Sequence, residues 1–252
     1  MDFFLNEILE DEQVKQYIEA HTERFSQAFF LSRQIADGLT YEKPDGELAL
    51  FTLASMADAA LKKMLERGIP RIVAVDTLRD INLWIRNHRK VYGTIGVMEF
   101  DWLLNHYHHL NIVRLGRLQY QLREKDGETV LDTHVPQDEP LTTEACLASF
   151  EMAKQFFVKD HPTRLICHSW LLCPRLAELL PAESNIIRFM QLWTQEPCKP
   201  DNSVQAMERI FGFGFTADRL ADAPEDSSLQ RKAKRYLLDG GRLDACAGYI
   251  VL

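Results

Sequence analysis

Residues 118–135 read LQYQLREKDGETVLDTHV, and this stretch decides the fold class of the chain. Apolar and polar residues alternate from 118 to 123, which predicts a strand with one buried face. The Asp126-Gly127 pair that follows is a frequent signal for a hairpin turn between two strands. A returning strand is then expected over 129–135, ending at Pro136 because proline cannot continue the ladder. The stretch therefore predicts an antiparallel hairpin in a sheet.

Helices and strands alternate after the hairpin. Thr142 is the expected N-cap of a helix, with Glu144 in the first turn, where a carboxylate suits the positive helix end. The apolar face of this helix is predicted to hold Cys146, Phe150, Ala153, Phe156 and Phe157. The later pattern predicts strands at 165–171 and 186–193, a short helix from Pro174 to Leu180, helices near 203–210 and 227–239, and a last strand after Gly240-Gly241. This order predicts an α/β (α+β) sandwich with a mixed sheet.

The first hundred residues have the period of helices instead of strands. Apolar residues at spacings of three and four predict helices over 11–36, 47–67 and 97–109, and another with Asp76 as its N-cap. Glycines and prolines separate these segments. We therefore expect a helical N-terminal domain, residues 1–110, followed by an α/β domain, residues 111–252.

The composition is that of a globular protein, and it excludes several function classes. Hydrophobic residues make up 46% of the 252 residues and charged residues 26%. The apolar runs are too short to span a membrane and the N-terminus has no basic leader, so neither membrane insertion nor secretion is expected. The net charge is −8, and both halves carry more acidic than basic residues, which argues against nucleic acid as a partner. The basic cluster at 231–235 is interpreted as the solvated face of a helix end.

Five cysteines, an odd number without a C-x-x-C pair, favour free thiols over a disulfide framework. They are Cys146, Cys167, Cys173, Cys198 and Cys246. Free thiols are typical of a reducing compartment, so we expect a cytoplasmic protein.

Two histidines and a serine stand where chemistry is plausible. His134 ends the returning strand, at the kind of strand end where α/β folds bind ligands, and its imidazole would act as a general base or hydrogen bond with the following loop. His168 and Ser169 interrupt an apolar strand, and because neighbouring side chains face opposite sides, only one of them can face the core. Ser169 lacks the glycines of a G-x-S-x-G elbow, which argues against a hydrolase nucleophile. Cys167 and Cys173 are interpreted as small buried residues.

Two further motifs are candidate ligand sites. His106 and His109 would share one face of a helix, but no H-E-x-x-H motif or cysteine pair completes a zinc site, so no metal is expected. These histidines are interpreted as a polar helix end. Gly212-Phe213-Gly214 lacks the remaining residues of a phosphate-binding loop and is interpreted as a turn.

Four segments of the second half carry a resemblance to a known family. They are His134-Val135-Pro136, Pro140-Leu141-Thr142, CHSWLLCP at 167–174 and LPAESNIIRF at 180–189. With these segments the chain resembles a bacterial family of acyltransferase-domain proteins, most specifically over residues 168–188, and the likeness continues to Gly248-Tyr249. It implies a helical N-terminal domain followed by a GNAT-like C-terminal domain.

The resemblance also implies a reaction, the transfer of an acyl group from acyl-CoA, such as acetyl-CoA, to the amine of a small molecule. In GNAT-like enzymes two central parallel strands splay apart and hold the acyl-CoA; here these would be the strand ending at His134 and the strand carrying Cys167–Leu171. His134 or His168 would be the base, and Ser169 would position the acceptor or protonate the leaving thiolate. The backbone N–H near Val135 would polarise the thioester carbonyl. The remaining implied contacts are Gln137, Leu141, Thr142 and Thr143 for CoA, and Trp170, Asn185 and Arg188 for the acceptor.

One departure from the GNAT pattern leaves an alternative open. GNAT enzymes usually carry (R/Q)-x-x-G-x-(G/A) where the CoA diphosphate binds, whereas this chain has Gln137-Asp138-Glu139-Pro140-Leu141. This segment lacks glycine and adds two carboxylates, which repel a diphosphate. The alternative is a non-catalytic GNAT-like binding module for a small molecule or peptide. The acceptor, the acyl group and the oligomeric state are left open.

Overall fold

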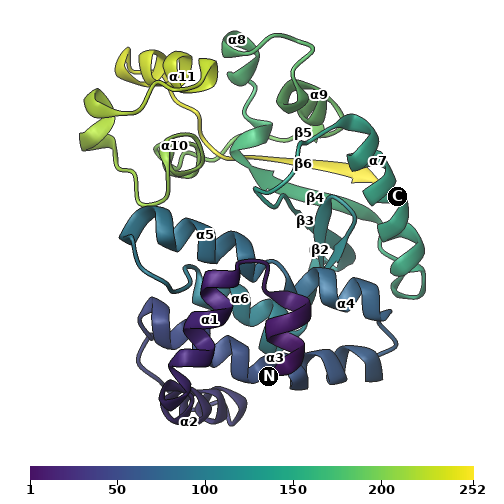
Figure 1. The fold of residues 1–252 in the computed structure, drawn as a ribbon. Helices are drawn as coiled ribbons and strands as arrows, with labels where there is room; N and C mark the ends of the chain where they lie inside the picture. Colours follow the sequence, from purple (N-terminus) through teal and green to yellow (C-terminus); the bar gives the residue numbers. More distant parts are fainter. The chain divides into compact units, whose positions relative to one another are not determined.

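A computed structural model describes all residues from 1 to 252, and the chain divides into two compact units, residues 1–114 and 115–252 (Figure 1). The first unit is helical up to residue 109, and the second contains nearly the whole of a six-stranded sheet. The fold class is therefore the expected one, a helical region followed by a mixed α/β sandwich. No helix is both long enough and apolar enough to cross a membrane.

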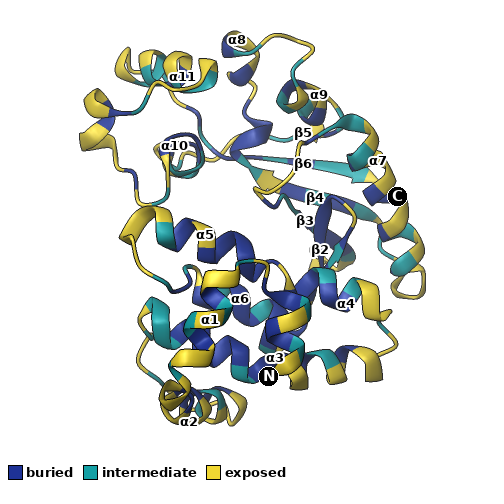
Figure 2. Cartoon of the chain, in the orientation of Figure 1, coloured by how far each residue is buried: buried dark blue, intermediate teal, exposed yellow.

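The helical unit is built around α3, Gly46–Glu66, whose buried residues gather between Ala49 and Ala60 and which contacts α2, α4 and α6 (Figure 2). Asp45 caps the start of α3, where its carboxylate accepts a hydrogen bond from the Leu48 amide at 2.8 Å. The other helical segments are η1 Phe4–Ile8, α1 Glu12–Ala20, η2 Thr22–Arg24, α2 Phe25–Ala36, α4 Arg71–Leu78, α5 Ile81–Tyr92, α6 Phe100–Leu104 and η3 Asn105–His109.

Two expectations for this unit are wrong in their boundaries. The helix expected over 11–36 is divided between α1 and α2, because His21 leaves the helical conformation with φ −120° and ψ 43°. Asp76 lies inside α4 instead of capping a helix, and Pro70 precedes α4, since the fixed φ of proline suits a helix start.

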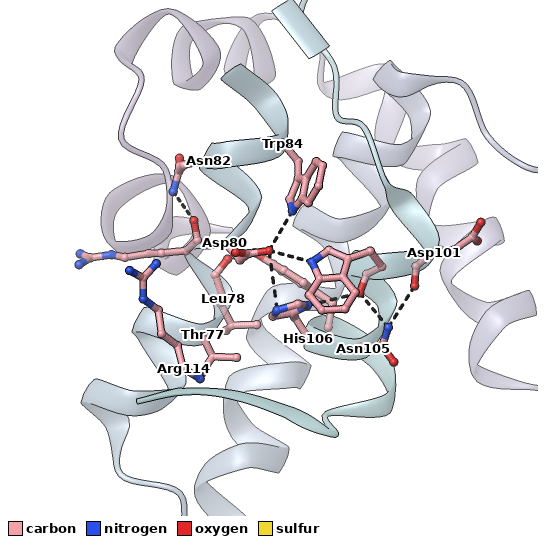
Figure 3. Close-up of polar contacts among 12 residues, drawn as sticks. Thr77, Leu78, Asp80, Asn82, Trp84, Asp101, Asn105, His106 and Arg114 are labelled. Carbon is pink, nitrogen blue, oxygen red and sulfur yellow. Dashed lines mark hydrogen bonds and ion pairs between the residues drawn. The ribbon is translucent and has the colours of Figure 1, made fainter. Parts of the chain in front are cut away.

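A buried polar cluster holds α5 against α6 and η3 (Figure 3). One carboxylate oxygen of Asp80 accepts hydrogen bonds from the indole N–H groups of Trp84 at 2.9 Å and Trp102 at 3.1 Å. His106 Nε2 lies 3.7 Å from the same oxygen, and both side chains are almost fully buried. His106 is therefore part of the core and does not belong to a polar helix end, which corrects the expectation for this residue.

The sheet has the strand order β1-β2-β3-β4-β6-β5. Its strands are β1 Ile112–Leu115, β2 Leu118–Lys125, β3 Glu128–His134, β4 Arg164–Ser169, β5 Thr194–Gln195 and β6 Cys246–Val251. The expected hairpin is confirmed: β2 and β3 are antiparallel, and Asp126 and Gly127 both have positive φ, 54° and 80°. β3 and β4 are parallel, whereas β6 is antiparallel to both β4 and β5. The sheet is mixed, as expected.

Helix α7, Thr143–Phe156, covers one face of this sheet. The hydroxyl of Ser149 on α7 lies 2.8 Å from the hydroxyl of Tyr120 on β2 and donates to the carbonyl of Leu115. The remaining helical segments of this unit are η4 Val158–Asp160, η5 Trp170–Leu172, α8 Leu176–Leu179, α9 Asn185–Gln191, α10 Val204–Phe211, η6 Ala217–Asp222 and α11 Ser228–Leu238.

Residues 185–191 form α9 and are not the strand expected over 186–193, because Ser184 caps this segment by accepting a hydrogen bond from the Ile187 amide at 3.3 Å. Only 194–195 is extended, as β5. Cys198 and Cys246 form a disulfide, which corrects the expectation that all five cysteines are free. The other three cysteines are free and buried.

Candidate functional site

The parallel strands β3 and β4 part within the sheet. They pair only at Val130–Arg164, Leu131–Leu165 and Asp132–Ile166. Beyond these pairs β3 continues to His134 against β2, and β4 continues to Ser169 against β6. The two strand ends therefore separate where a GNAT-like fold would hold its ligand, and His134 and His168 lie on the two sides of this opening.

Both histidines lie on the same face of the sheet, opposite α7. Tyr120 faces α7 and is paired with Thr133, so the next residue, His134, points to the other face. Asp132 is paired with Ile166, and two residues further along the strand His168 shares that face. His168 is exposed, and its ring makes no hydrogen bond with the protein, whereas His134 is half-buried. The His168 ring is thus accessible and has no hydrogen-bond partner in the protein.

Two polar groups at the end of β3 and just after it make no hydrogen bond with the protein. Thr133 is only 2% exposed, and its Oγ1 has no hydrogen-bond partner. The Val135 amide, one residue beyond the last β2–β3 pair, donates no backbone hydrogen bond. The Thr133 side chain shares the α7 face with Tyr120, away from both histidines, so the half-buried Val135 amide is the group that can donate to a ligand where the strands part. An N–H at this position suits the developing negative charge on a thioester oxygen.

Ser169 and Trp170 have structural contacts of their own. Ser169 points to the face opposite His168, and its hydroxyl accepts a hydrogen bond from the Leu171 amide at 3.2 Å. The Trp170 amide donates to the side chain of Gln205 at 2.7 Å, a contact with no signal in the sequence. Since Ser169 and His168 do not share a face, the arrangement lacks the nucleophile–base pair that a serine hydrolase needs.

The buried cysteines are not nucleophiles either. Burial raises the pKa values of Cys167 and Cys173, which keeps both thiols protonated near neutral pH. Their interpretation as small buried residues is confirmed.

The segment between β3 and α7 contains the residues expected to contact CoA. Thr142 caps α7 as predicted, because its hydroxyl accepts from the Ala145 amide at 3.3 Å. The next residue, Thr143, has a buried Oγ1 without a partner. Leu141 is buried, and the side chain of Gln137 donates to the carbonyl of Arg209 at 3.3 Å. This helix start, with its free amides, suits a phosphate group.

Asn185 and Arg188 are exposed on α9, which packs against α7 and η5. No contact connects either residue to His134 or His168, and their role at the acceptor stays a prediction.

A second candidate site is a cavity of about 1030 Å³ within the helical unit. Tyr17, Glu47, His88, Tyr92 and Glu99 are among its lining residues. The His88 Nδ1 lies 3.1 Å from the carbonyl of Thr94, to which it donates a hydrogen bond. This cavity has room for a small molecule, as the binding-module alternative requires.

Comparisons with known proteins identify both domains. Residues 4–109 match the model of the N-acyltransferase N-terminal domain, and residues 112–250 match that of the GNAT-like C-terminal domain. The chain is similar to an acyltransferase crystallised with decanoyl-CoA and teicoplanin, with 26% identity, a TM-score of 0.84, and coverage of 99% of this chain and 86% of the other.

An acyltransferase mutant in complex with octanoyl-CoA gives the same values of identity, TM-score and coverage. An acyltransferase in complex with CoA and 10C-teicoplanin has 24% identity, a TM-score of 0.82, and the same coverage of both chains. No curated protein matches the chain. The two domain matches together span nearly all of the sequence, and the chain therefore belongs to the acyltransferase family that joins an N-acyltransferase N-terminal domain to a GNAT-like C-terminal domain.

Proposed function

We propose that the chain is an acyl-CoA-dependent N-acyltransferase, with its catalytic centre where β3 and β4 part. The observation that carries this proposal is the exposed, unpartnered imidazole of His168 on one side of the opening, with the free Val135 amide on the other strand. The complexes of similar acyltransferases with decanoyl-CoA, octanoyl-CoA and CoA support acyl-CoA as the cosubstrate.

The proposed reaction needs three contributions from the protein. The Val135 N–H donates a hydrogen bond to the thioester oxygen and stabilises the charge that develops there. The acceptor nitrogen attacks the carbonyl carbon, a C–N bond forms, and His168 takes the proton that the nitrogen loses. The C–S bond then breaks, and the CoA thiolate leaves and is protonated by water. His134 lies on the same face as a second imidazole, whereas the Ser169 hydroxyl points to the other face, accepts a hydrogen bond from the Leu171 amide, and takes no part in the proposed reaction.

The segment from Gln137 to Thr143 is assigned to the CoA diphosphate. The Thr143 and Glu144 amides lie in the first turn of α7, where the helix dipole favours negative charge. Thr143 Oγ1 offers a hydroxyl donor that no protein group uses.

The acceptor is proposed to be a small molecule with a primary or secondary amine. Support comes from the similar acyltransferases whose crystals contain teicoplanin or 10C-teicoplanin beside the cosubstrate. The residues proposed to select the acceptor are Trp170, Asn185 and Arg188. Of these, Trp170 is nearest in sequence to the proposed base, His168.

The direct test is an acyl-transfer assay with octanoyl-CoA and a panel of amines, read by thiol release and by mass spectrometry of the product. His168→Gln is expected to lower the rate at least about 100-fold, since positioned general bases contribute about 10²–10⁴. His161→Gln is the matched control, because His161 is also exposed but precedes the first residue of β4, at the other end of the strand from His168. A His168→Gln enzyme as active as the wild type would exclude His168 as the base.

The binding-module alternative is supported by the cavity around His88 in the helical unit. It predicts saturable binding of a small molecule without turnover of any acyl-CoA. This alternative would be favoured if the wild-type protein releases no CoA with any amine but binds a small molecule, and if His88→Ala abolishes that binding.

A further inference from the structure

The segment between β3 and α7 has no glycine, yet it lies where the proposed function places a diphosphate. Residues 136–141 read PQDEPL, with two carboxylates and two prolines. Diphosphate loops normally use glycines so that backbone N–H groups can turn toward the phosphates. A different interaction must therefore fix the conformation of this loop if it is to bind CoA.

This interaction comes from Arg117, which lies in the turn between β1 and β2 and is only 5% exposed. Its Nη2 donates hydrogen bonds to the carbonyls of Pro136 at 2.9 Å and Glu139 at 2.8 Å. Its Nε donates to the carbonyl of Pro140 at 3.2 Å. One planar guanidinium thus holds three backbone carbonyls of the loop.

The same guanidinium offsets part of the negative charge of the loop. Arg117 Nη1 lies 3.7 Å from the carboxylate of Asp138, whose side chain is 19% exposed. The cation neutralises one of the two carboxylates that would repel a diphosphate, and at this depth it is screened little by solvent.

The three carbonyl contacts also fix where the amides of the loop point. In a planar trans peptide the C=O of one residue and the N–H of the next point in opposite directions. The Gln137 and Leu141 N–H groups, which follow the Pro136 and Pro140 carbonyls, are therefore directed away from Arg117. Neither amide has an acceptor in the protein. They add two donors to those at the start of α7.

We propose that Arg117 is the positioning residue for the CoA diphosphate: by binding the carbonyls of residues 136–140, it replaces the missing glycines and turns the loop amides outward. This inference rests on the proposed function. Arg117 does not contact the reacting atoms, so it controls the affinity for acyl-CoA and leaves the chemical step unchanged.

The test compares two acyl donors on the complete protein, octanoyl-CoA and octanoyl-pantetheine, which carries the same thioester without the diphosphate. Arg117→Lys keeps the charge, but a single ammonium cannot hold three carbonyls in one plane. It is expected to raise the KM for octanoyl-CoA at least about 10-fold, with kcat within about threefold and with the KM for octanoyl-pantetheine unchanged.

Arg164→Lys is the matched control, because it makes the same substitution at the first residue of β4, where Arg164 lies 3.3 Å from Glu128 at the start of β3 and far from the loop. It is expected to leave the ratio of the two KM values at the wild-type level. Equal increases in both KM values for Arg117→Lys, or a loss confined to kcat, would overturn the role of Arg117.

A second measurement does not depend on the folding of any variant. In amide NMR spectra of the wild-type protein, CoA is expected to shift the Gln137 and Leu141 signals, and octanoyl-pantetheine is not. CoA binding that leaves both signals in place would overturn the inference alone. Wild-type protein that binds no CoA at all would overturn the proposed function and this inference together.

Discussion

The buried carboxylate of Asp80 offers the sharpest test of how the helical unit is held together. Asp80→Ala removes the acceptor of two indole N–H groups, those of Trp84 and Trp102, at 2.9 and 3.1 Å. Hydrogen bonds to a charged group contribute about 1.5–3 kcal/mol each, and unsatisfied buried donors keep their desolvation cost. We expect the free energy of unfolding to fall by about 3–5 kcal/mol.

The assay is urea unfolding followed by circular dichroism and tryptophan fluorescence, because two of the four tryptophans belong to this cluster. Asp80→Asn keeps one acceptor oxygen for the indoles and should cost about 1–2 kcal/mol. Asp76→Ala is the control: this exposed carboxylate lies 3.8 Å from Arg79 and should change the unfolding free energy by less than about 0.5 kcal/mol. An Asp80→Ala loss below about 1 kcal/mol would refute the account of this cluster.

Three further predictions concern the cysteines and the hairpin. Burial raises the pKa of Cys146 from 9.0 to about 11, so this thiol should be unreactive toward a disulfide reagent at pH 8. Because the folded state favours the protonated thiol, the stability that Cys146 contributes should be present below pH 9 and lost as the pH rises to 11. Reduction of the Cys198–Cys246 disulfide, which joins residues 48 apart, should lower the unfolding free energy by about 2–4 kcal/mol, and alkylation before reduction should find these two cysteines protected. Gly127→Ala should cost about 1 kcal/mol in urea unfolding, because φ is 80° while the added methyl would meet no atom; an unchanged midpoint would contradict the hairpin geometry.

The parts of the fold that could be predicted from the sequence are those fixed by local chemistry. The hairpin followed from alternation and an Asp-Gly pair, and the start of α7 from the threonine that caps it. The prediction of a strand at 186–193 is wrong because a short apolar run fits a buried strand as well as a helix. The signal for a helix is Ser184, which caps its start.

Contacts between distant segments were beyond the reach of the sequence pattern. The cysteine count gave no reason to pair Cys198 with Cys246, because the register that brings them together depends on the position of β6. Arg117 reads as an ordinary charged residue in a turn, and its hold on the 136–140 loop depends on where β3 ends. His168 is predictable as a candidate because a polar side chain in an apolar strand needs an explanation, whereas its exposure depends on what covers its face of the sheet.

Hydrogen–deuterium exchange with and without octanoyl-CoA tests where acyl-CoA binds on the wild-type protein. If acyl-CoA binds where β3 and β4 part, exchange should slow in peptides covering 133–143 and 167–170, and the His168→Gln protein should show the same protection without turnover. Exchange that is unchanged in these peptides, or slowed only around the cavity near His88, would contradict the account.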